Sequence, residues 1–342
     1  MRAGYLVEPR HVEIREVDMP YAEAGGIVVK VRAALTDGTD LKAFRRGHPL
    51  MPMPTRFGHE FSGDVAAVGA GVEAFAVGDP VMMVQSGPDG TCYWCLRAEE
   101  ELCERLTTTM IFGAYAEYIA VPSHIVARNV FRKPDALSYE AAAFLEPVSC
   151  VVRSLRALGP RRGDVIAIVG DGGFGVLHAL VALAHGARPI LVGRRPARLE
   201  LARTLGVNTV IDAGEGDSVA AVRERTHGRG ADAIIETTGT QAIWESAPEY
   251  VRRGGTAVLF GGLPGGTEVT YDAARLHYDG VRLVSPFHFT PRDVRAAFEL
   301  LAEGALDVEP LISERFALGA LAEAFARLDE DRGINLKFAI LP

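Results

Sequence analysis

A glycine-rich turn that directly follows an apolar run is the feature that most constrains this chain. Residues 165–169 read Val-Ile-Ala-Ile-Val, and a G-x-G-x-x-G pattern at 170–175 leads into an apolar, Ala-rich segment at 176–184. A continuous apolar run is typical of a buried parallel strand, and the glycines let the chain approach a pyrophosphate closely. The following helix offers free N–H groups to that phosphate. Strand, turn and helix together predict a dinucleotide site, with contacts at Gly170, Gly172, Gly173, Phe174 and Gly175.

The region from about Ser138 onward alternates apolar strands with helices. Helices are expected at 176–184 and 195–205, among others. This alternation predicts an α/β fold with a doubly wound parallel sheet. The expected strands of that sheet are 165–169, 189–193, 208–211, 232–236, 256–260 and 281–284.

The first part of the chain is rich in β-strand signals. Strands are expected at 26–34 and 61–69, in segments bounded by Gly and Pro, and these favour a barrel-like domain. The end of the chain adds an amphipathic helix at 291–303 and a strand-like segment at 336–340. A length of 342 residues exceeds one typical domain, so two domains are expected.

Composition and charge predict a soluble enzyme in the cytoplasm. Hydrophobic residues make up 48% of the chain, and the formal net charge is -8. The negative charge argues against nucleic acid or an anionic membrane as a partner. No apolar run reaches the length of a membrane span, and the first residues lack the apolar region of a secretory signal. Four cysteines are too few for a disulfide scaffold, and the isolated Cys150 is expected to be buried.

Two further clusters carry a resemblance to a known family. Asp37-Gly38-Thr39-Asp40 precedes Gly58-His59-Glu60-Phe61-Ser62-Gly63, and Asp89-x-x-Cys92-x-x-Cys95 is followed by Cys103. Together with the glycine turn, these motifs resemble the zinc-dependent medium-chain dehydrogenases of the alcohol dehydrogenase-like superfamily, particularly the sorbitol, iditol and threonine dehydrogenase branch. The resemblance covers essentially the whole chain, and the motifs stand in that family's order and spacing.

The resemblance implies a division into domains and a quaternary state. A Rossmann dinucleotide-binding domain at 141–285 would be inserted in a GroES-like β-barrel catalytic domain made of residues 1–140 and 286–342. Relatives pair the edges of their nucleotide domains, so a homo-oligomer, either a dimer or a tetramer, is expected.

The cysteine cluster is expected to hold a structural zinc. Zinc prefers four tetrahedral ligands, and thiolates two residues apart can reach one ion from a tight loop. The family's structural site has four cysteines, and Cys92, Cys95 and Cys103 match the last three. Asp89 stands at the first position, and its carboxylate is also an acceptable zinc ligand. The alternative is a loop with three reduced thiols and no metal.

A second, catalytic zinc is implied by the family, but this chain departs from the usual ligands. The family supplies a cysteine where Asp37 stands, a histidine at His59 and an acidic residue at Glu146. Asp, His and Glu still make a reasonable site with one position open, although a set without thiolate can accept another divalent metal. The alternative is a lost metal site in which His59 and Glu60 only form hydrogen bonds. Glu60 could also be a replacement ligand or a nearby base.

Residues beside the expected metal have roles implied by the resemblance. Thr39 stands where the family carries the hydroxyl that passes the substrate proton toward solvent, and a hydroxyl can both donate and accept. Capping the helix at 40–45 is an alternative role for Thr39. Asp40 matches the carboxylate that orients the imidazole of His59. Lys42 stands where some relatives end the proton relay, and it is expected to be a solvated lysine.

The end of the second strand of the nucleotide domain bears on cofactor choice. NAD enzymes usually place Asp or Glu there, whereas this chain has Gly193 followed by Arg194 and Arg195. Loss of the carboxylate removes repulsion against a 2′-phosphate, and guanidinium groups pair well with phosphate. The sequence therefore favours NADP over NAD. The alternative is that the arginines cap the next helix or stack on adenine.

The expected reaction is hydride transfer between a secondary alcohol and the nicotinamide. Ligands bind outside the carboxyl ends of strands in an open α/β sheet, so loops with Thr238 and Gly261 should flank the nicotinamide. His288 can line the substrate pocket or be a structural histidine. Glu146-Pro147 and the resemblance to the polyol branch favour a hydroxylated substrate such as a sugar, polyol or cyclitol. Alternatives are an amino-alcohol (threonine-like) or simple alcohol/aldehyde oxidoreductase, or a nucleotide-binding protein without enzymatic activity that has lost its metal.

Overall fold

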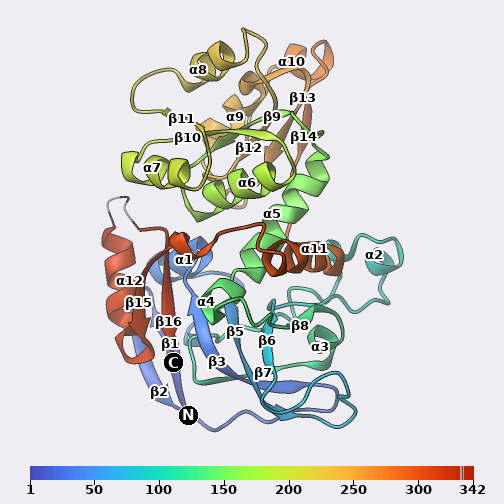
Figure 1. The fold of residues 1–342 in the computed structure, drawn as a ribbon, viewed down its shortest axis with the longest axis vertical. Coiled ribbons are helices and arrows are strands. Elements are labelled where there is room, and N and C mark those ends of the chain that lie inside the picture. Colours follow the sequence, from blue (N-terminus) through green and yellow to red (C-terminus); the bar gives the residue numbers. More distant parts are fainter. Residues whose placement is uncertain (332, 334) are drawn as a thin grey trace. The chain divides into compact units, whose positions relative to one another are not determined.

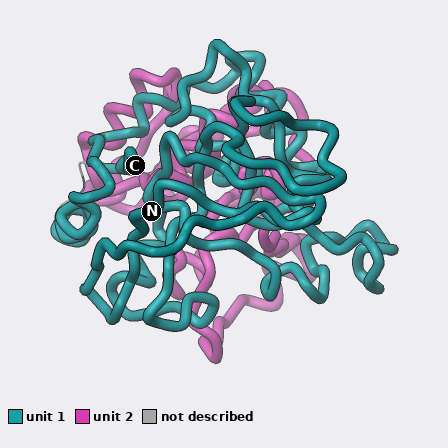
Figure 2. The backbone as a smooth tube through the Cα atoms, turned by 90° about the horizontal axis from the view of Figure 1, so that it is seen from below, with its two compact units in different colours: residues 1–149, 289–342 teal, residues 150–288 magenta. Residues whose placement is uncertain are grey.

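The computed structural model describes residues 1–331, 333 and 335–342, and these form two compact units (Figure 2). One unit is Met1–Ser149 with Phe289–Pro342, and the other is Cys150–His288. The expected domain boundaries lay after residues 140 and 285. Helix α5 (Leu145–Leu158) runs across the first division of the structure. Arg332 and Ile334, which the expected catalytic domain includes, lie outside the described residues.

The second unit contains a six-stranded sheet in which all neighbouring strands are parallel. The strand order is β11-β10-β9-β12-β13-β14, which confirms the predicted doubly wound sheet (Figure 1). The strands are β9 (Val165–Val169), β10 (Arg188–Gly193), β11 (Thr209–Asp212), β12 (Ala231–Glu236), β13 (Val251–Leu259) and β14 (Arg282–Val284).

The helices of this unit connect the parallel strands. They are α6 (Gly173–Ala184), α7 (Pro196–Thr204), α8 (Ser218–Arg225), α9 (Gln241–Tyr250) and α10 (Ala273–His277). Helix α6 begins inside the glycine turn, with Gly172 as its N-cap. Its apolar residues from Val176 to Ala182 are buried, because α6 packs against β9 and β10.

The first unit is built on a seven-stranded sheet and a three-stranded sheet. The larger sheet runs β15-β16-β3-β5-β6-β8, with β7 also paired to β3, and the smaller runs β2-β1-β4. The strands are β1 (Arg2–Glu8), β2 (His11–Glu16), β3 (Ile27–Leu35), β4 (Thr55–Arg56), β5 (Glu60–Val68), β6 (Pro80–Met83), β7 (Tyr118–Val121), β8 (Val130–Arg132), β15 (Ile312–Ala317) and β16 (Lys337–Leu341).

Short helices surround these sheets. They are α1 (Gly38–Arg46), α2 (Tyr93–Leu96), α3 (Ser123–Asn129), α4 (Tyr139–Ala142), α11 (Pro291–Ala302), α12 (Leu321–Glu330) and the 3₁₀ turns η1 (Glu100–Leu102), η2 (Glu309–Leu311) and η3 (Leu318–Ala320). Strand β16 pairs with β3, so the last strand of the chain lies in one sheet with strands from the first part of the chain. Among the described residues, no helix combines the length and apolarity needed to cross a membrane.

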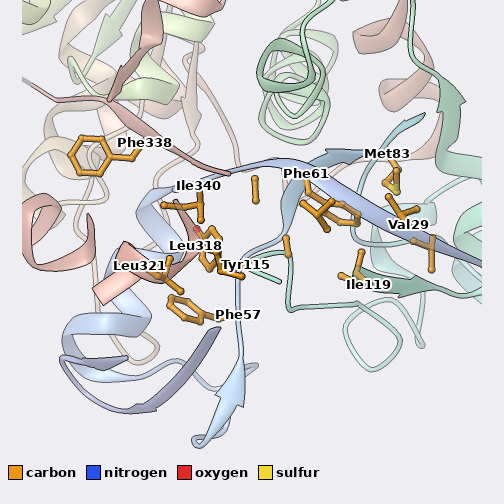
Figure 3. Close-up of a cluster of buried hydrophobic side chains, with 14 of the residues drawn as sticks. Val29, Phe57, Phe61, Met83, Tyr115, Ile119, Leu318, Leu321, Phe338 and Ile340 are labelled. Atoms are coloured by element: carbon orange, nitrogen blue, oxygen red, sulfur yellow. The ribbon is translucent and has the colours of Figure 1, made fainter. Parts of the chain in front are cut away.

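The core of the first unit is a cluster of buried hydrophobic side chains, several of them aromatic (Figure 3). The ring of Phe57 lies 4.9 Å from that of Tyr115 and 5.0 Å from that of Phe325, centroid to centroid. All three side chains are fully buried. The ring of Phe44 on α1 lies 5.4 Å from that of Phe325, and Phe57 stands three residues before β5, so this packing helps to hold both elements in place. Cys150 is partly exposed on α5, so the prediction that it is buried was wrong.

Candidate active site

The site begins at the short connection between β3 and α1, where Asp37 follows the end of the strand by two residues and caps the helix. The Asp37 Oδ1 atom accepts a hydrogen bond of 2.8 Å from the Asp40 N–H, and Asp37 has extended backbone angles typical of an N-cap. The alternative that Thr39 caps this helix is therefore wrong. Thr39, in the first turn of α1, is partly exposed. Lys42 is exposed, as expected.

His59 immediately precedes β5, and two carboxylates approach its two ring nitrogens. Its Nε2 atom lies 3.8 Å from Asp37 Oδ2, and its Nδ1 atom lies 3.4 Å from Asp40 Oδ1. His59 is 5% exposed and Asp40 is fully buried. The hydroxyl of Tyr115 donates a 2.6 Å hydrogen bond to Asp40 Oδ2 and so holds this carboxylate against the ring. Asp40 thus positions the imidazole from its Nδ1 side, and the Nε2 atom faces Asp37.

Two more buried carboxylates lie near His59. Glu146, at the start of α5, accepts a 2.9 Å hydrogen bond from the side-chain amide of Gln85. Glu60 is fully buried, and the ammonium of Lys337 contacts both of its oxygens, at 2.7 and 2.6 Å. Lys337 also donates to the Thr36 carbonyl at 3.0 Å. Glu60 is therefore held by an ion pair with a residue on β16.

These side chains form two overlapping clusters of possible metal ligands. Asp37, Asp40 and His59 form one, and His59, Glu60 and Glu146 form the other, with ligand atoms within 4.8 Å of one another in each. The expected ligand set of Asp37, His59 and Glu146 draws one carboxylate from each cluster. In tetrahedral zinc sites, ligand atoms about 2 Å from the ion lie roughly 3.3 Å apart, which is near the 3.8 Å separation of His59 Nε2 and Asp37 Oδ2.

The electrostatics of the pocket favour a bound cation. Among the described residues, four buried carboxylates lie near His59 and the ammonium of Lys337: Asp37, Asp40, Glu60 and Glu146. Burial of several like charges costs free energy, and a further positive group nearby reduces that cost. The donor set and its surplus of negative charge therefore fit a divalent metal ion.

The buried charges also shift the pKa values of the ligand candidates. Burial raises the pKa of Asp37, but the charges of His59 and Lys337 outweigh burial, so the pKa lies below its usual value. Burial lowers the pKa of His59, but Asp40 and Asp37 outweigh it, so the pKa is raised well above the usual value. A metal ion that binds His59 must therefore displace a proton from it.

The loop at 89–103 brings the second predicted ligand set together. Asp89, Cys92, Cys95 and Cys103 offer ligand atoms within 4.8 Å of one another, and the sulfur atoms of Cys92 and Cys95 are 3.5 Å apart. Asp89 Oδ1 accepts the N–H groups of Thr91 at 2.7 Å and Cys92 at 2.9 Å. These hydrogen bonds lower the pKa of Asp89. Three sulfurs and a carboxylate at this spacing fit a closed zinc site.

The glycine turn in the second unit has the close contacts that its pattern predicts. A Cβ atom on Gly175 would lie 1.8 Å from the Gly170 carbonyl oxygen, and one on Gly170 would lie 2.3 Å from Thr237 Oγ1. Gly170 also has a positive φ of 123°. Only glycine fits these positions, because a side chain would push the turn away from the helix.

The strand ends beside the turn are organised by a buried carboxylate. Glu236 Oε1 accepts hydrogen bonds from the backbone N–H of Thr238 at 2.6 Å and of Gly239 at 2.9 Å. A Cβ atom on Gly261 would lie 2.3 Å from the Gly239 nitrogen, so the two loops pack directly together. Phe174 contacts Phe260 at 5.0 Å between ring centroids. His288 is partly exposed and has a positive φ of 53°.

Several of these residues were missed by the sequence analysis. Lys337 lies within a predicted strand, 277 positions from Glu60, and a single lysine in a strand is an ordinary solvated residue. Tyr115 and Gln85 likewise lie outside the recognised motifs. Asp171 occupies a variable position of the glycine pattern, and its carboxylate contacts the residues after Gly193. The one available signal was its charge, since a carboxylate is unexpected next to a pyrophosphate site.

The parallel sheet with its glycine turn and the β-rich unit with its buried histidine and carboxylates define a class: the two-domain dehydrogenases that use a dinucleotide and a metal. Two family models match this chain. The "alcohol dehydrogenase GroES-like domain" covers residues 23–135, and the "zinc-binding dehydrogenase" covers residues 173–303. The chain belongs to the zinc-dependent medium-chain dehydrogenases of the alcohol dehydrogenase-like superfamily.

Similar proteins agree with this assignment. Sorbitol dehydrogenase of Bacillus subtilis (strain 168) is 30% identical, over 100% of this chain and 97% of its own length. L-threonine 3-dehydrogenase of Pyrococcus abyssi (strain GE5 / Orsay) is 32% identical, over 89% of this chain and 88% of its own length. The crystal structure of a zinc-binding dehydrogenase from Sinorhizobium meliloti 1021 bound to NADP has a TM-score of 0.91 at 28% identity, covering 100% of this chain and 99% of that one. These matches confirm the predicted family and the GroES-like and Rossmann folds.

Proposed function

We propose that this protein transfers a hydride between a secondary alcohol, of the sugar, polyol or cyclitol class, and a nicotinamide dinucleotide. In the oxidative direction the alcohol becomes a carbonyl compound and releases one proton, while the oxidised cofactor takes up the hydride. The observation that carries the proposal is the burial of Asp37, His59 and Glu146, none more than 7% exposed, in two overlapping clusters of possible metal ligands that share His59. The similarity to sorbitol dehydrogenase supports the polyol class.

The proposed catalytic metal ligands are Asp37, His59 and Glu146. When bound, zinc supplies a Lewis acid that lowers the pKa of an alcohol hydroxyl, and the nicotinamide supplies the redox chemistry. Asp40 orients His59 through its Nδ1 atom, and Tyr115 in turn holds Asp40. Gln85 fixes Glu146, and Lys337 restrains Glu60 as a base or alternative ligand near the same histidine.

The substrate proton leaves through Thr39 in this proposal. Thr39 is a partly exposed residue two positions after the buried Asp37, a place from which its hydroxyl could pass a proton between the ligand cluster and solvent. A hydroxyl suits this task because it accepts one proton while it donates another.

Asp89, Cys92, Cys95 and Cys103 are the proposed ligands of a second, structural zinc. A site with four protein ligands leaves no open position for substrate, so this ion would stabilise the loop rather than take part in the reaction.

The proposed cofactor contacts lie along the glycine turn and the neighbouring strand ends. They are Gly170, Gly172, Gly173, Phe174, Gly175, Gly193, Arg194, Arg195, Thr238 and Gly261. We take NADP as the preferred dinucleotide, because Gly193 contributes no carboxylate and the exposed guanidinium groups of Arg194 and Arg195 can pair with a 2′-phosphate. The NADP-bound relative from Sinorhizobium meliloti supports this choice.

The domain division and the assembly complete the proposal. Residues 1–140 and 286–342 act as the catalytic domain and residues 141–285 as the dinucleotide domain. The working form is a homo-oligomer, a dimer or a tetramer, in the cytoplasm, and its substrate is a small molecule.

Amino-alcohol oxidation is a second candidate, because the chain is equally similar to an L-threonine 3-dehydrogenase. A panel of polyols, cyclitols, threonine and simple alcohols, assayed with NAD and NADP at the nicotinamide absorbance, separates the candidates. Fastest turnover with a polyol or cyclitol supports the proposal, and fastest turnover with threonine replaces it by the second. A folded, metal-loaded protein that turns over no member of the panel contradicts both.

A further inference from the structure

The carboxylate of Asp171 lies buried among hydrogen-bond donors at the end of β10. Its side chain is only 4% exposed. The Oδ2 atom accepts the backbone N–H groups of Arg194 and Arg195, each at 2.7 Å. The Oδ1 atom is 3.2 Å from a guanidinium nitrogen of Arg195 and 4.0 Å from one of Arg198. The Asp171 carboxylate thus accepts hydrogen bonds from two consecutive backbone amides and from the Arg195 guanidinium group, with the Arg198 guanidinium group nearby.

The same carboxylate explains why residue 193 is a glycine. A Cβ atom on Gly193 would lie 2.5 Å from the Asp171 Cβ atom and 2.6 Å from its Oδ2 atom. An aspartate or glutamate at 193 would therefore collide with Asp171. The acidic group that NAD enzymes usually place at this strand end is instead supplied from the glycine turn, 22 positions earlier in the chain.

The donors around Asp171 form a binding site for an anion. Two adjacent backbone N–H groups that immediately precede α7, joined by a guanidinium group, can bind an anion such as phosphate. These donors belong to the residues that follow Gly193, where a dinucleotide's 2′-phosphate would be recognised. In this chain they are already paired with a carboxylate of the protein itself.

We propose that Asp171 weakens the binding of NADP relative to NAD, because its carboxylate occupies the anion site that a 2′-phosphate needs. This inference rests on the proposed function, in which the glycine turn binds a nicotinamide dinucleotide. A 2′-phosphate must displace the carboxylate from the two amides or remain outside them on the exposed parts of Arg194 and Arg195. Negative charge on Asp171 also repels the phosphate directly. Asp171 therefore limits the advantage that the two arginines give to NADP.

The test compares Asp171→Asn with the wild type. The asparagine side chain keeps the size of the aspartate and loses its charge, so the amides and Arg195 can turn to the phosphate. Calorimetric titration of the full-length protein gives the dissociation constants of NAD⁺ and NADP⁺. We expect the ratio of the two constants to shift toward NADP⁺ by about tenfold or more, the usual size of a charge-assisted hydrogen-bond effect. Most of the shift should come from tighter NADP⁺ binding.

A matched control separates this effect from a general change of charge. Glu200→Gln removes one carboxylate from α7, where Glu200 is exposed and contacts Arg203 at 2.9 Å. It should leave the ratio within about twofold of the wild type. Asp171→Ser, with a shorter side chain that can still accept one amide, is a second test variant and should shift the ratio in the same direction as Asp171→Asn.

The outcomes distinguish this inference from the function on which it rests. A wild type that binds neither dinucleotide overturns both. Binding of dinucleotides with an unchanged ratio in either folded Asp171 variant, or with the same shift in Glu200→Gln, overturns the role of Asp171 alone.

Discussion

At the scale of single residues, Asp37 uses its two carboxylate oxygens for two tasks. Oδ1 caps α1, and Oδ2 faces His59 Nε2. A cysteine, which the family usually carries at this position, caps helices poorly, whereas aspartate is among the best N-caps. The exchange of a thiolate for a carboxylate therefore strengthens the start of α1 while it keeps a negatively charged group beside the histidine.

Asp37→Ser separates the two tasks of this residue. The serine hydroxyl can still accept the Asp40 N–H, so the thermal midpoint should change little. We expect turnover to fall roughly 100-fold or more and the metal content to fall by one ion per chain, because a carboxylate ligand is lost. Asp37→Ala should show the same losses and, in addition, a stability lower by about 1 kcal/mol. Full activity and unchanged metal content in Asp37→Ala would rule out Asp37 as a ligand.

His178 gives the second unit a pH-dependent stability. It is fully buried on α6, with Nδ1 2.7 Å from the Phe174 carbonyl oxygen. Burial lowers its pKa to about 4, and the hydrogen bond to Phe174 only partly opposes burial. The unfolded chain, with an ordinary histidine pKa of about 6.5, then binds more protons than the folded chain between these two values.

The resulting prediction is that stability is greatest above pH of about 6.5 and falls as the pH drops toward 4. His178 should account for about 3 kcal/mol of that fall. In urea unfolding followed at several pH values, His178→Leu should flatten this part of the profile. His185→Leu, a change at an exposed histidine at the end of the same helix, is the matched control. Parallel profiles for His178→Leu and the wild type would show that the buried imidazole is not responsible.

At the scale of elements, the sheet of the second unit was predictable and its exceptions have local causes. The strands at 165–169 and 189–193 agree closely with β9 and β10, because buried parallel strands are written as unbroken apolar runs. Strand β13 begins at Val251, five residues before the predicted start at 256. Arg252, Arg253 and two glycines interrupt the apolar run there, but the backbone still pairs with β12 through an irregular register.

The candidate site was predictable only where its residues belong to compact motifs. Asp37, Asp40 and His59 were found because they stand in two short motifs that resemble those of the family. Lys337 was missed, since its contact with Glu60 depends on β16 returning to the sheet from the far end of the chain. The effect of Asp171 on Gly193 was missed for a related reason. Strands β9 and β10 are parallel neighbours, so the end of β10 lies beside the turn that follows β9. Only the folded chain shows that the Asp171 carboxylate fills the space where a side chain at position 193 would lie.

The loop at 89–103 is an element whose structure should depend on its metal. Its regular structure consists of the four-residue α2 and the short η1. The four candidate ligand side chains come together from different parts of the loop, so a bound metal would link those parts. Asp89→Asn keeps an oxygen for the N–H groups of Thr91 and Cys92 but removes the charge. We expect this variant to lose zinc at a chelator concentration roughly tenfold or more below that required for the wild type.

Asp89→Cys is the matched variant for the same loop, because it restores the family's fourth thiolate. It should hold zinc more tightly than the wild type in the same chelator titration, since thiolate is a softer and stronger zinc ligand than carboxylate. Equal zinc retention in the wild type, Asp89→Asn and Asp89→Cys would show that residue 89 supports the loop without contacting the metal.

At the scale of the whole molecule, the two proposed metal sites differ in chemistry and should therefore be emptied separately. The pocket of Asp37, His59 and Glu146 offers oxygen and nitrogen ligands and one open position, whereas the 89–103 loop offers three sulfurs and no open position. A chelator has direct access to a metal with an open coordination position. Oxygen ligands also hold zinc less strongly than thiolates. The active pocket should lose its ion first.

The final prediction is a two-step loss of about two zinc ions per chain during titration with a chelator. Turnover should disappear with the first ion, while the thermal midpoint falls mainly with the second, because the loop loses its centre only then. Metal content by mass spectrometry, turnover and thermal unfolding on the same samples give the three curves. Zinc added after the first step should restore turnover, and Asp37→Ser should begin the titration with one ion and show only the second step. Turnover that persists in fully chelated protein would show that the reaction does not need the metal. A protein that starts with one ion per chain, and loses it together with thermal stability, would be a nucleotide-binding protein without a catalytic metal.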